Sequence, residues 1–96
     1  MKIRLHAGAR ADLREGRNFY KERSPLAAVL FLETIEEAVV RITEAPERHP
    51  LREHGTREYV LPGRFPYTIV YRIRERDLLI VAVAHQSREP GYWQDR

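Results

Sequence analysis

The sequence predicts an α+β domain: an N-terminal strand, an antiparallel helical hairpin, a three- to four-stranded, mainly antiparallel sheet, and a short C-terminal segment. Two long segments carry apolar residues at helical spacing, and Ser24-Pro25 between them is a strong helix-start signal. Large apolar side chains alternate in residues 66–73, as in a half-buried strand, and residues 78–84 are apolar throughout, as in a fully covered strand. The chain, residues 1–96, is expected to fold as a single domain around one modest core.

The first strand and the first helix are predicted from a change in the spacing of apolar residues along the chain. In residues 2–6, two aliphatic side chains face one way, and the polar ones, ending with His6, face the other. From Ala9 to about Lys21 the apolar residues recur at helical spacing. Asp12 lies near the start of this helix and is expected to interact favourably with the helix dipole.

The second helix is expected to run from Pro25 to about Glu44 and to end before Pro46. Ser24 and at most two further residues separate the helices, so they should form an antiparallel hairpin that covers one face of the sheet. The predicted core-facing stripe consists of Ala28, Phe31, Ile35, Ala38, Val39 and Ile42.

The rest of the sheet is predicted from turn signals. Residues 45–56 form a polar loop, and residues 57–61 alternate like a further strand. Pro62-Gly63 is a turn signal, and residues 74–77 are a polar break short enough for a hairpin turn. The last three strands are therefore close enough in sequence to form an antiparallel meander.

The chain after the last strand, from His85 to Arg96, concentrates polar groups and contains the only Trp. Pro90-Gly91 is expected to make a turn that folds Tyr92 and Trp93 back over the sheet. We expect these two rings to cover the sheet rather than to form a platform for stacking bases.

Charge is distributed unevenly along a chain whose net charge is +3. Residues 1–23 carry seven basic and three acidic side chains, and residues 24–45 carry four Glu and one Arg. Residues 46–76 carry seven Arg and four Glu. A basic domain with an acidic strip can meet nucleic acid, or an acidic protein, through its basic parts.

Several function classes find no support in the sequence. There is no Cys, so disulfide and thiolate chemistry are excluded. No apolar run approaches the roughly 20 residues of a membrane helix, and the N-terminus lacks the apolar stretch of a signal peptide. We expect no membrane association and a cytoplasmic location.

Cofactor and metal sites are also not expected. No Gly-rich phosphate-binding loop is present, and no two His residues have helical metal-ligand spacing. His49, Glu53 and His54 lie in one loop, but no further ligand is clustered with them. We therefore expect neither a metal nor a cofactor.

His85 ends the apolar strand, and a period of two places it on the same face as Leu79, Val81 and Val83. Ser87 is expected to point to the opposite face, so the two side chains should not form a catalytic pair. Two interpretations of His85 stay open. It is either a half-buried side chain bonded to the backbone, or a general acid or base in a groove with arginines nearby.

Segments along nearly the whole chain resemble the RelE/ParE superfamily, the toxins of bacterial type II toxin–antitoxin pairs. These segments are Ala11-Asp12-Leu13, Ala45-Pro46, Phe65-Pro66-Tyr67 with Val70-Tyr71, and His85 through Arg88 to Pro90-Gly91-Tyr92-Trp93 and Arg96. The final block is the most specific part and is most similar to the ParE branch. The resemblance implies the fold predicted above and a labile antitoxin, a ParD-like or similar DNA-binding protein, as partner.

The two branches imply different mechanisms. RelE-like toxins cut mRNA in the ribosomal A site, whereas ParE-like toxins stall DNA gyrase on cleaved DNA. The lysine cluster of the RelE branch has no match here, because Lys occurs only at Lys2 and Lys21. The loop has Arg48, Arg52 and Arg57 instead, and Arg is a poor base because it hardly deprotonates. His85 fits both branches, so the ParE branch is favoured.

The resemblance therefore implies a monomeric toxin that inhibits DNA gyrase by binding, with no catalytic residues. The alternative is a metal-independent endoribonuclease that acts with the ribosome on mRNA. Its candidate catalytic residues are His85, Arg64, Arg72, Arg88 and Tyr92. A third possibility is a relative that binds its antitoxin but is not toxic.

The second helix carries apolar residues beyond its core-facing stripe, namely Leu26, Val29, Leu30 and Leu32. A helix that is apolar on more than one side needs a second cover. We therefore expect an antitoxin helix to pack on Leu26, Val29 and Leu30, and an acidic segment of the antitoxin to contact Arg4 and Arg14.

Overall fold

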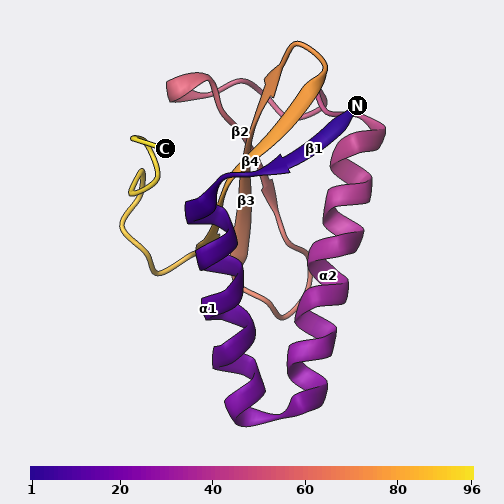
Figure 1. The fold of residues 1–96 in the computed structure, drawn as a ribbon, viewed down its shortest axis with the longest axis vertical. Coiled ribbons are helices and arrows are strands. Elements are labelled where there is room, and N and C mark those ends of the chain that lie inside the picture. The colour runs from indigo at the N-terminus through magenta and orange to yellow at the C-terminus, as the bar shows by residue number, and fades with distance from the viewer.

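The computed structural model describes all residues from Met1 to Arg96. Two helices and four strands follow one another in the predicted order (Figure 1). These elements are β1 (Lys2–Leu5), α1 (Ala7–Arg23), α2 (Pro25–Glu44), β2 (Arg57–Val60), β3 (Tyr67–Arg74) and β4 (Asp77–His85), with a short 3-10 helix at Glu53–Gly55. The predicted α+β class is confirmed. Neither α1 nor α2 is both long and apolar enough to cross a membrane.

The four strands form one sheet in the order β1-β4-β3-β2. β2, β3 and β4 make the predicted antiparallel meander, and β1 pairs with β4 in parallel. The parallel pairing runs from Lys2 opposite Asp77 to Leu5 opposite Ile80. β1 therefore covers only the first half of β4, and the edge of the second half has no strand beside it.

A β-bulge in β4 changes which side chains face the helices. Tyr71 pairs with Ile80 and Val70 pairs with Ala82, so Val81 is an extra residue without a partner across the ladder. Side chains before and after Val81 therefore do not follow one alternation. Ile80 and Val83 both belong to the core under the helices, although they are three residues apart.

The bulge overturns the expected position of His85 relative to the strand. Leu79 and Val81 lie on the face away from the helices, whereas Val83 lies on the helix-covered face. The ring of His85 contacts the ring of Tyr67, which also belongs to the helix-covered face, at 5.0 Å between centroids. The prediction that His85 shares a face with Leu79 and Val81 is thus wrong.

Side-chain caps decide where both helices begin. The Nδ1 atom of His6 accepts a hydrogen bond from the backbone N–H of Gly8 at 2.9 Å, so α1 begins two residues earlier than predicted. His6 is therefore a helix cap and not the last residue of the strand. The hydroxyl of Ser24 accepts from the N–H of Ala27 at 3.4 Å, and α2 has the predicted bounds.

The main core lies between the helices and one face of the sheet. It contains Ala9, Phe31, Ile35, Ala38, Ile42, Leu61, Phe65, Tyr67, Ile69, Tyr71, Leu78, Ile80 and Val83. Gly16 lets α1 come close to this core, because a Cβ there would lie 2.9 Å from the ring of Phe31 and 3.1 Å from the hydroxyl of Tyr67.

The C-terminal segment covers the other face of the sheet. Figure 1 shows this segment, in yellow, on the side of the sheet away from α2. Trp93 is only 8% exposed and packs with Val70, Val81 and Ala82. The predicted cover over the sheet is therefore present, and the sheet lies between a helical layer and a short irregular segment.

Candidate functional site

An open groove of about 380 Å³ lies between α1 and the end of β4. Its lining combines charged, hydroxyl and aromatic side chains. They are Asp12, Glu15, Gly16, Phe19, Tyr67, Val83, His85, Ser87 and Arg88. The groove is the place where α1, the sheet and the start of the C-terminal segment meet.

Asp12 forms one wall of this groove and is 7% exposed. Its Oδ2 atom accepts a hydrogen bond from Nη1 of Arg96 at 2.7 Å and another from the hydroxyl of Tyr92 at 2.9 Å. The backbone N–H of Val83 donates to the same oxygen at 3.2 Å. Asp12 therefore connects α1, β4 and the C-terminal segment.

The role of Asp12 differs from the one that the sequence predicted. Asp12 lies beyond the first turn of α1, which contains no acidic residue, so it is not placed for the dipole interaction expected there. The missed signal is positional. Asp12 follows Ala9 by three residues and precedes Gly16 by four, so it lies on the buried face of the helix, where an unpaired carboxylate would be costly.

Asp12 and Arg96 take the place of a strand at the free edge of β4. Past the end of β1, the N–H of Val83 donates to Asp12, and the carbonyl of Val81 accepts from Arg96 at 3.2 Å. Buried backbone groups at a sheet edge need such partners. Gly8 makes room for this arrangement, because a Cβ at that position would clash with the guanidinium of Arg96.

Tyr92 contributes its hydroxyl to this network and its ring to the surface. The guanidinium of Arg88 lies 3.8 Å from the centre of the Tyr92 ring. Burial, and after it the hydrogen bond to Asp12, raise the pKa of Tyr92 to about 12. At neutral pH the hydroxyl is therefore a hydrogen-bond donor within the fold and a poor proton acceptor.

His85 and Ser87 are in contact, contrary to the prediction from the sequence. Nδ1 of His85 accepts from the N–H of Ser87 at 3.0 Å and lies 2.7 Å from the Ser87 hydroxyl oxygen. Residues two apart lie on the same side of an extended strand, so the expectation of opposite faces was wrong. The turn closed by the N–H of Arg88, which donates to the carbonyl of His85, keeps the two side chains together. A neutral ring that accepts at Nδ1 carries its proton on Nε2.

The structure brings together three of the five candidate catalytic residues. His85, Arg88 and Tyr92 line a shallow groove at the end of β4. Arg72 is 9% exposed, lies on the face of the sheet away from the helices and does not line this groove; it donates to the carbonyls of His54 at 3.0 Å and Arg96 at 2.9 Å.

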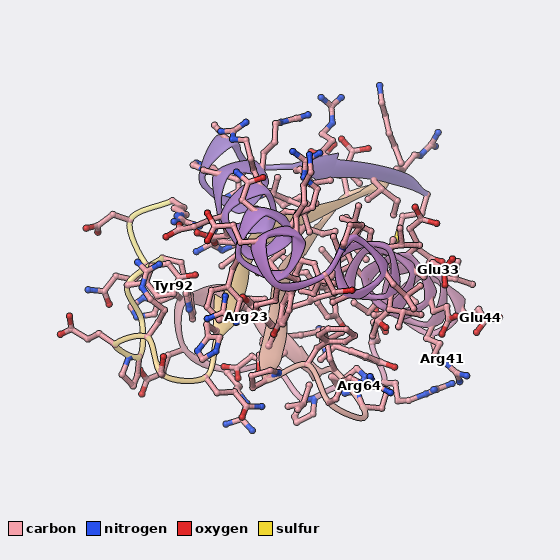
Figure 2. The ribbon with its side chains drawn as sticks, turned by 90° about the horizontal axis from the view of Figure 1, so that it is seen from below. Arg23, Glu33, Arg41, Glu44, Arg64 and Tyr92 are labelled. Carbon is pink, nitrogen blue, oxygen red and sulfur yellow. The ribbon has the colours of Figure 1, made fainter.

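Arg64 is exposed in the loop before β3. Figure 2 shows the side chain of Arg64 well separated from that of Tyr92. The five side chains therefore do not form one constellation, and Arg72 connects the loop after α2 to the C-terminal segment.

The loop histidines lie apart from each other. The ring of His49 packs against Tyr59, at 5.4 Å between centroids, and the ring of His54 packs against Trp93, at 6.0 Å. No group of three or more His, Asp or Glu side chains in the chain is arranged to hold a metal ion.

The residues predicted to meet an antitoxin are mostly exposed. Leu26 is 63% and Val29 is 50% exposed on α2, whereas Leu30 packs partly against the core. Arg4 lies on β1 in an exposed salt bridge with Asp77 at 2.8 Å, and Arg14 is exposed on α1.

A comparison of the chain with models of protein families decides its relationship. The model described as ParE toxin of type II toxin–antitoxin system, parDE, matches residues 3–90. The chain belongs to the ParE toxin family. The resemblance found in the sequence, including its ParE branch, is thereby confirmed.

Individual ParE-type proteins agree with this assignment. The chain is 31% identical over 92 residues to Toxin ParE2 of Mycobacterium tuberculosis, which covers 94% of this chain and 86% of that toxin. A solved structure titled chromosomal ParDE TA system from P. aeruginosa matches with a TM-score of 0.76 at 21% identity. That match covers 88% of this chain and 95% of the other, and it supports the fold.

The match to the ParE family model covers only part of the hydrogen-bond network around Asp12. Asp12, Val83 and His85 lie within the matched residues 3–90, whereas Tyr92 and Arg96 follow them. The buried carboxylate thus belongs to the family-matched part of this chain, and two of its donors come from the segment after it.

Proposed function

We propose that this ParE-family chain is the toxin of a type II toxin–antitoxin pair, inhibits DNA gyrase by binding, and is neutralised by a cognate antitoxin. The observation that carries the proposal is the family match over residues 3–90. A cytoplasmic location accompanies this target. The toxin acts as a monomer that folds without its partner.

The geometry of the groove supports binding rather than hydrolysis. RNA cleavage requires a base for the ribose 2′-hydroxyl and an acid for the leaving oxygen. Of the candidate residues, Tyr92 donates its hydroxyl to Asp12, and Arg72 is bonded to two backbone carbonyls on the other face. Of the candidate residues, only His85 is left as a possible acid or base at the groove.

The antitoxin-binding surface is proposed on α2 and on the basic residues nearby. Leu26 and Val29 are the large exposed apolar residues in the first half of α2, and Leu30 lies beside them. An antitoxin helix buries these side chains, and an acidic segment of the antitoxin reaches Arg4 and Arg14.

The antitoxin surface is tested by a titration with the cognate antitoxin. Val29→Glu places a charge on an exposed position, so the free chain should keep its melting temperature while affinity falls at least about tenfold. Leu30→Glu should weaken the complex as well, with some loss of stability because Leu30 touches the core. Arg48→Glu, on an exposed loop residue, is the matched control. Unchanged affinity of both α2 variants would contradict the proposed surface.

The target is tested with two assays on the purified protein. Supercoiling by purified gyrase should be blocked, and translation in a cell-free extract should continue. His85→Gln should leave gyrase inhibition within about threefold, because no proton transfer depends on this side chain. Arrested translation with cuts in A-site mRNA, together with normal supercoiling, would identify the ribonuclease instead. Neither effect, with intact antitoxin binding, would identify a non-toxic relative.

A further inference from the structure

A row of four basic side chains runs along the outer face of α1. Its members are Arg10, Arg14, Arg17 and Lys21, spaced by four, three and four residues, and all are exposed. This spacing places them on one face of a helix, and at about 1.5 Å per residue the row is about 16 Å long. We call this set the basic row of α1.

The basic row is not neutralised within the chain. The two salt bridges of the structure, Arg4–Asp77 and Arg96–Asp12, include none of its members. Figure 2 shows many nitrogen-tipped side chains on the side formed by α1 and β1, while the labelled Glu33 and Glu44 project from α2 elsewhere. Like charges three and four residues apart repel one another on a helix, so the row opposes folding unless a partner neutralises it.

The surface around the row offers charge but no apolar anchor. The exposed residues beside its members on this face are Ala7, Ala11 and Asn18. On the same helix segment Leu13 packs against the core, and Phe19, which is 46% exposed, lines the groove beside α1 and is not part of the row. The fully buried core of a protein–protein interface is apolar and depleted in charged residues, and the exposed apolar residues Leu26 and Val29 lie on α2 instead.

We propose that the basic row of α1 binds the phosphate backbone of duplex DNA without reading its sequence. A duplex presents a negative charge about every 1.7 Å along a stiff axis, so the DNA can contact a straight row of cations without a loss of its own conformational entropy. A single-stranded nucleic acid or an extended peptide would have to be ordered over the same length, which costs conformational entropy. This binding goes beyond gyrase inhibition and does not depend on it.

The test is a titration of a fluorescein-labelled 20-bp duplex of arbitrary sequence with the full purified chain. Fluorescence anisotropy at several salt concentrations should give a plot of log K against log[salt] with a slope of about −3 to −4. Arg10→Ala combined with Arg17→Ala should make that slope shallower by about 2 and weaken binding at least about tenfold near 0.1 M salt. Arg14 stays intact in this variant, so the proposed antitoxin contact is not altered.

The matched control removes two positive charges elsewhere. Arg41→Ala combined with Arg64→Ala changes two side chains that Figure 2 shows away from α1, and should weaken binding by less than about threefold. Equal weakening by both double variants would overturn the proposal, because net charge alone would then explain binding. It would also be overturned by no binding at 50 mM salt, or by equal or tighter binding of a poly-glutamate peptide or a single-stranded RNA of matched charge. Gyrase is absent from this assay, so the outcome is independent of whether the chain inhibits it.

Discussion

The two faces of the sheet are covered in different ways. On one face, α1 and α2 enclose thirteen buried apolar and aromatic residues. On the other, Trp93 packs on Val70, Val81 and Ala82 in a cluster of four buried residues. The smaller cover is supplemented by polar anchors, namely the bonds of Arg72 to two carbonyls and the bonds of Arg96 and Tyr92 to Asp12.

The difference shows how a short irregular segment can be fixed on a sheet. The helical layer is stabilised by the large apolar area that it buries against the sheet, and each core residue contributes a part of that area. The C-terminal segment has one large buried ring, and its position depends on a few directional bonds to a carboxylate and an arginine. Such bonds are costly to break because a buried partner is left unpaired. The C-terminal side should therefore be the more sensitive one to polar substitutions.

The largest effect is expected from removal of residues 90–96. The deletion uncovers Val70, Val81 and Ala82 and leaves Asp12 without Arg96 and Tyr92. Loss of the Trp burial and of the carboxylate's partners should together cost about 5 kcal/mol in the free energy of unfolding. Urea unfolding of the truncated and full chains measures this. An equal free energy of unfolding for the two chains would show that the segment is an exposed arm.

The next effect tests the helix-covered face. Phe31→Ala removes a fully buried ring that lies 5.0 Å from Tyr67 and 5.2 Å from Tyr20 between centroids. The expected loss is about 4 kcal/mol, because a cavity remains where the ring was. Phe19→Ala, on a ring that is 46% exposed, is the matched control and should cost about 1 kcal/mol or less. Similar losses for both would contradict the assignment of Phe31 to the main core.

A smaller effect distinguishes the polar anchors from the apolar cover. Asp12→Ala leaves the guanidinium of Arg96 and the N–H of Val83 without their acceptor, so it should cost about 3 kcal/mol. Arg14→Ala, on the exposed face of the same helix, should change the free energy of unfolding by less than about 0.5 kcal/mol.

A double-mutant cycle with Arg96→Ala then isolates the pair. Chemical unfolding should give a coupling energy of at least about 1 kcal/mol between Asp12 and Arg96, since the two side chains are 6% and 19% exposed. Independent, additive losses would mean that Trp93 alone holds the segment.

The smallest effect uses one tyrosine on each face. Burial raises the pKa of Tyr67 and of Tyr92 to about 12, above the ordinary value of 10.0. Because the folded pKa is the higher one, the stability that each protonated hydroxyl contributes is complete below pH 10 and is lost as the pH rises through 12. Melting temperatures between pH 9 and pH 11 should fall less steeply for Tyr67→Phe and Tyr92→Phe than for the unaltered chain. Identical pH profiles would show that ionisation of these hydroxyls does not destabilise the folded chain.

Local patterns in the sequence determined most of the secondary structure and the family. Ser24-Pro25 set the start of α2, and alternation from Tyr67 to Ile73 set the faces of β3, as the structure confirms. The β3–β4 turn is narrower than predicted, at Glu75-Arg76, because both strands continue to its edge. Caps, turns and periodicity depend on residues close in sequence, so one sequence contains the information for them.

Only the tertiary structure decided how the site is assembled. Asp12 meets Val83, Tyr92 and Arg96, which lie 71 to 84 positions away in the chain. The bulge at Val81 moves His85 to the helix-covered face, and it depends on how β3 and β4 pair rather than on the composition of either strand. No local pattern specifies such contacts, because they satisfy buried polar groups that become unpaired only when β1 ends and the free edge of β4 is formed.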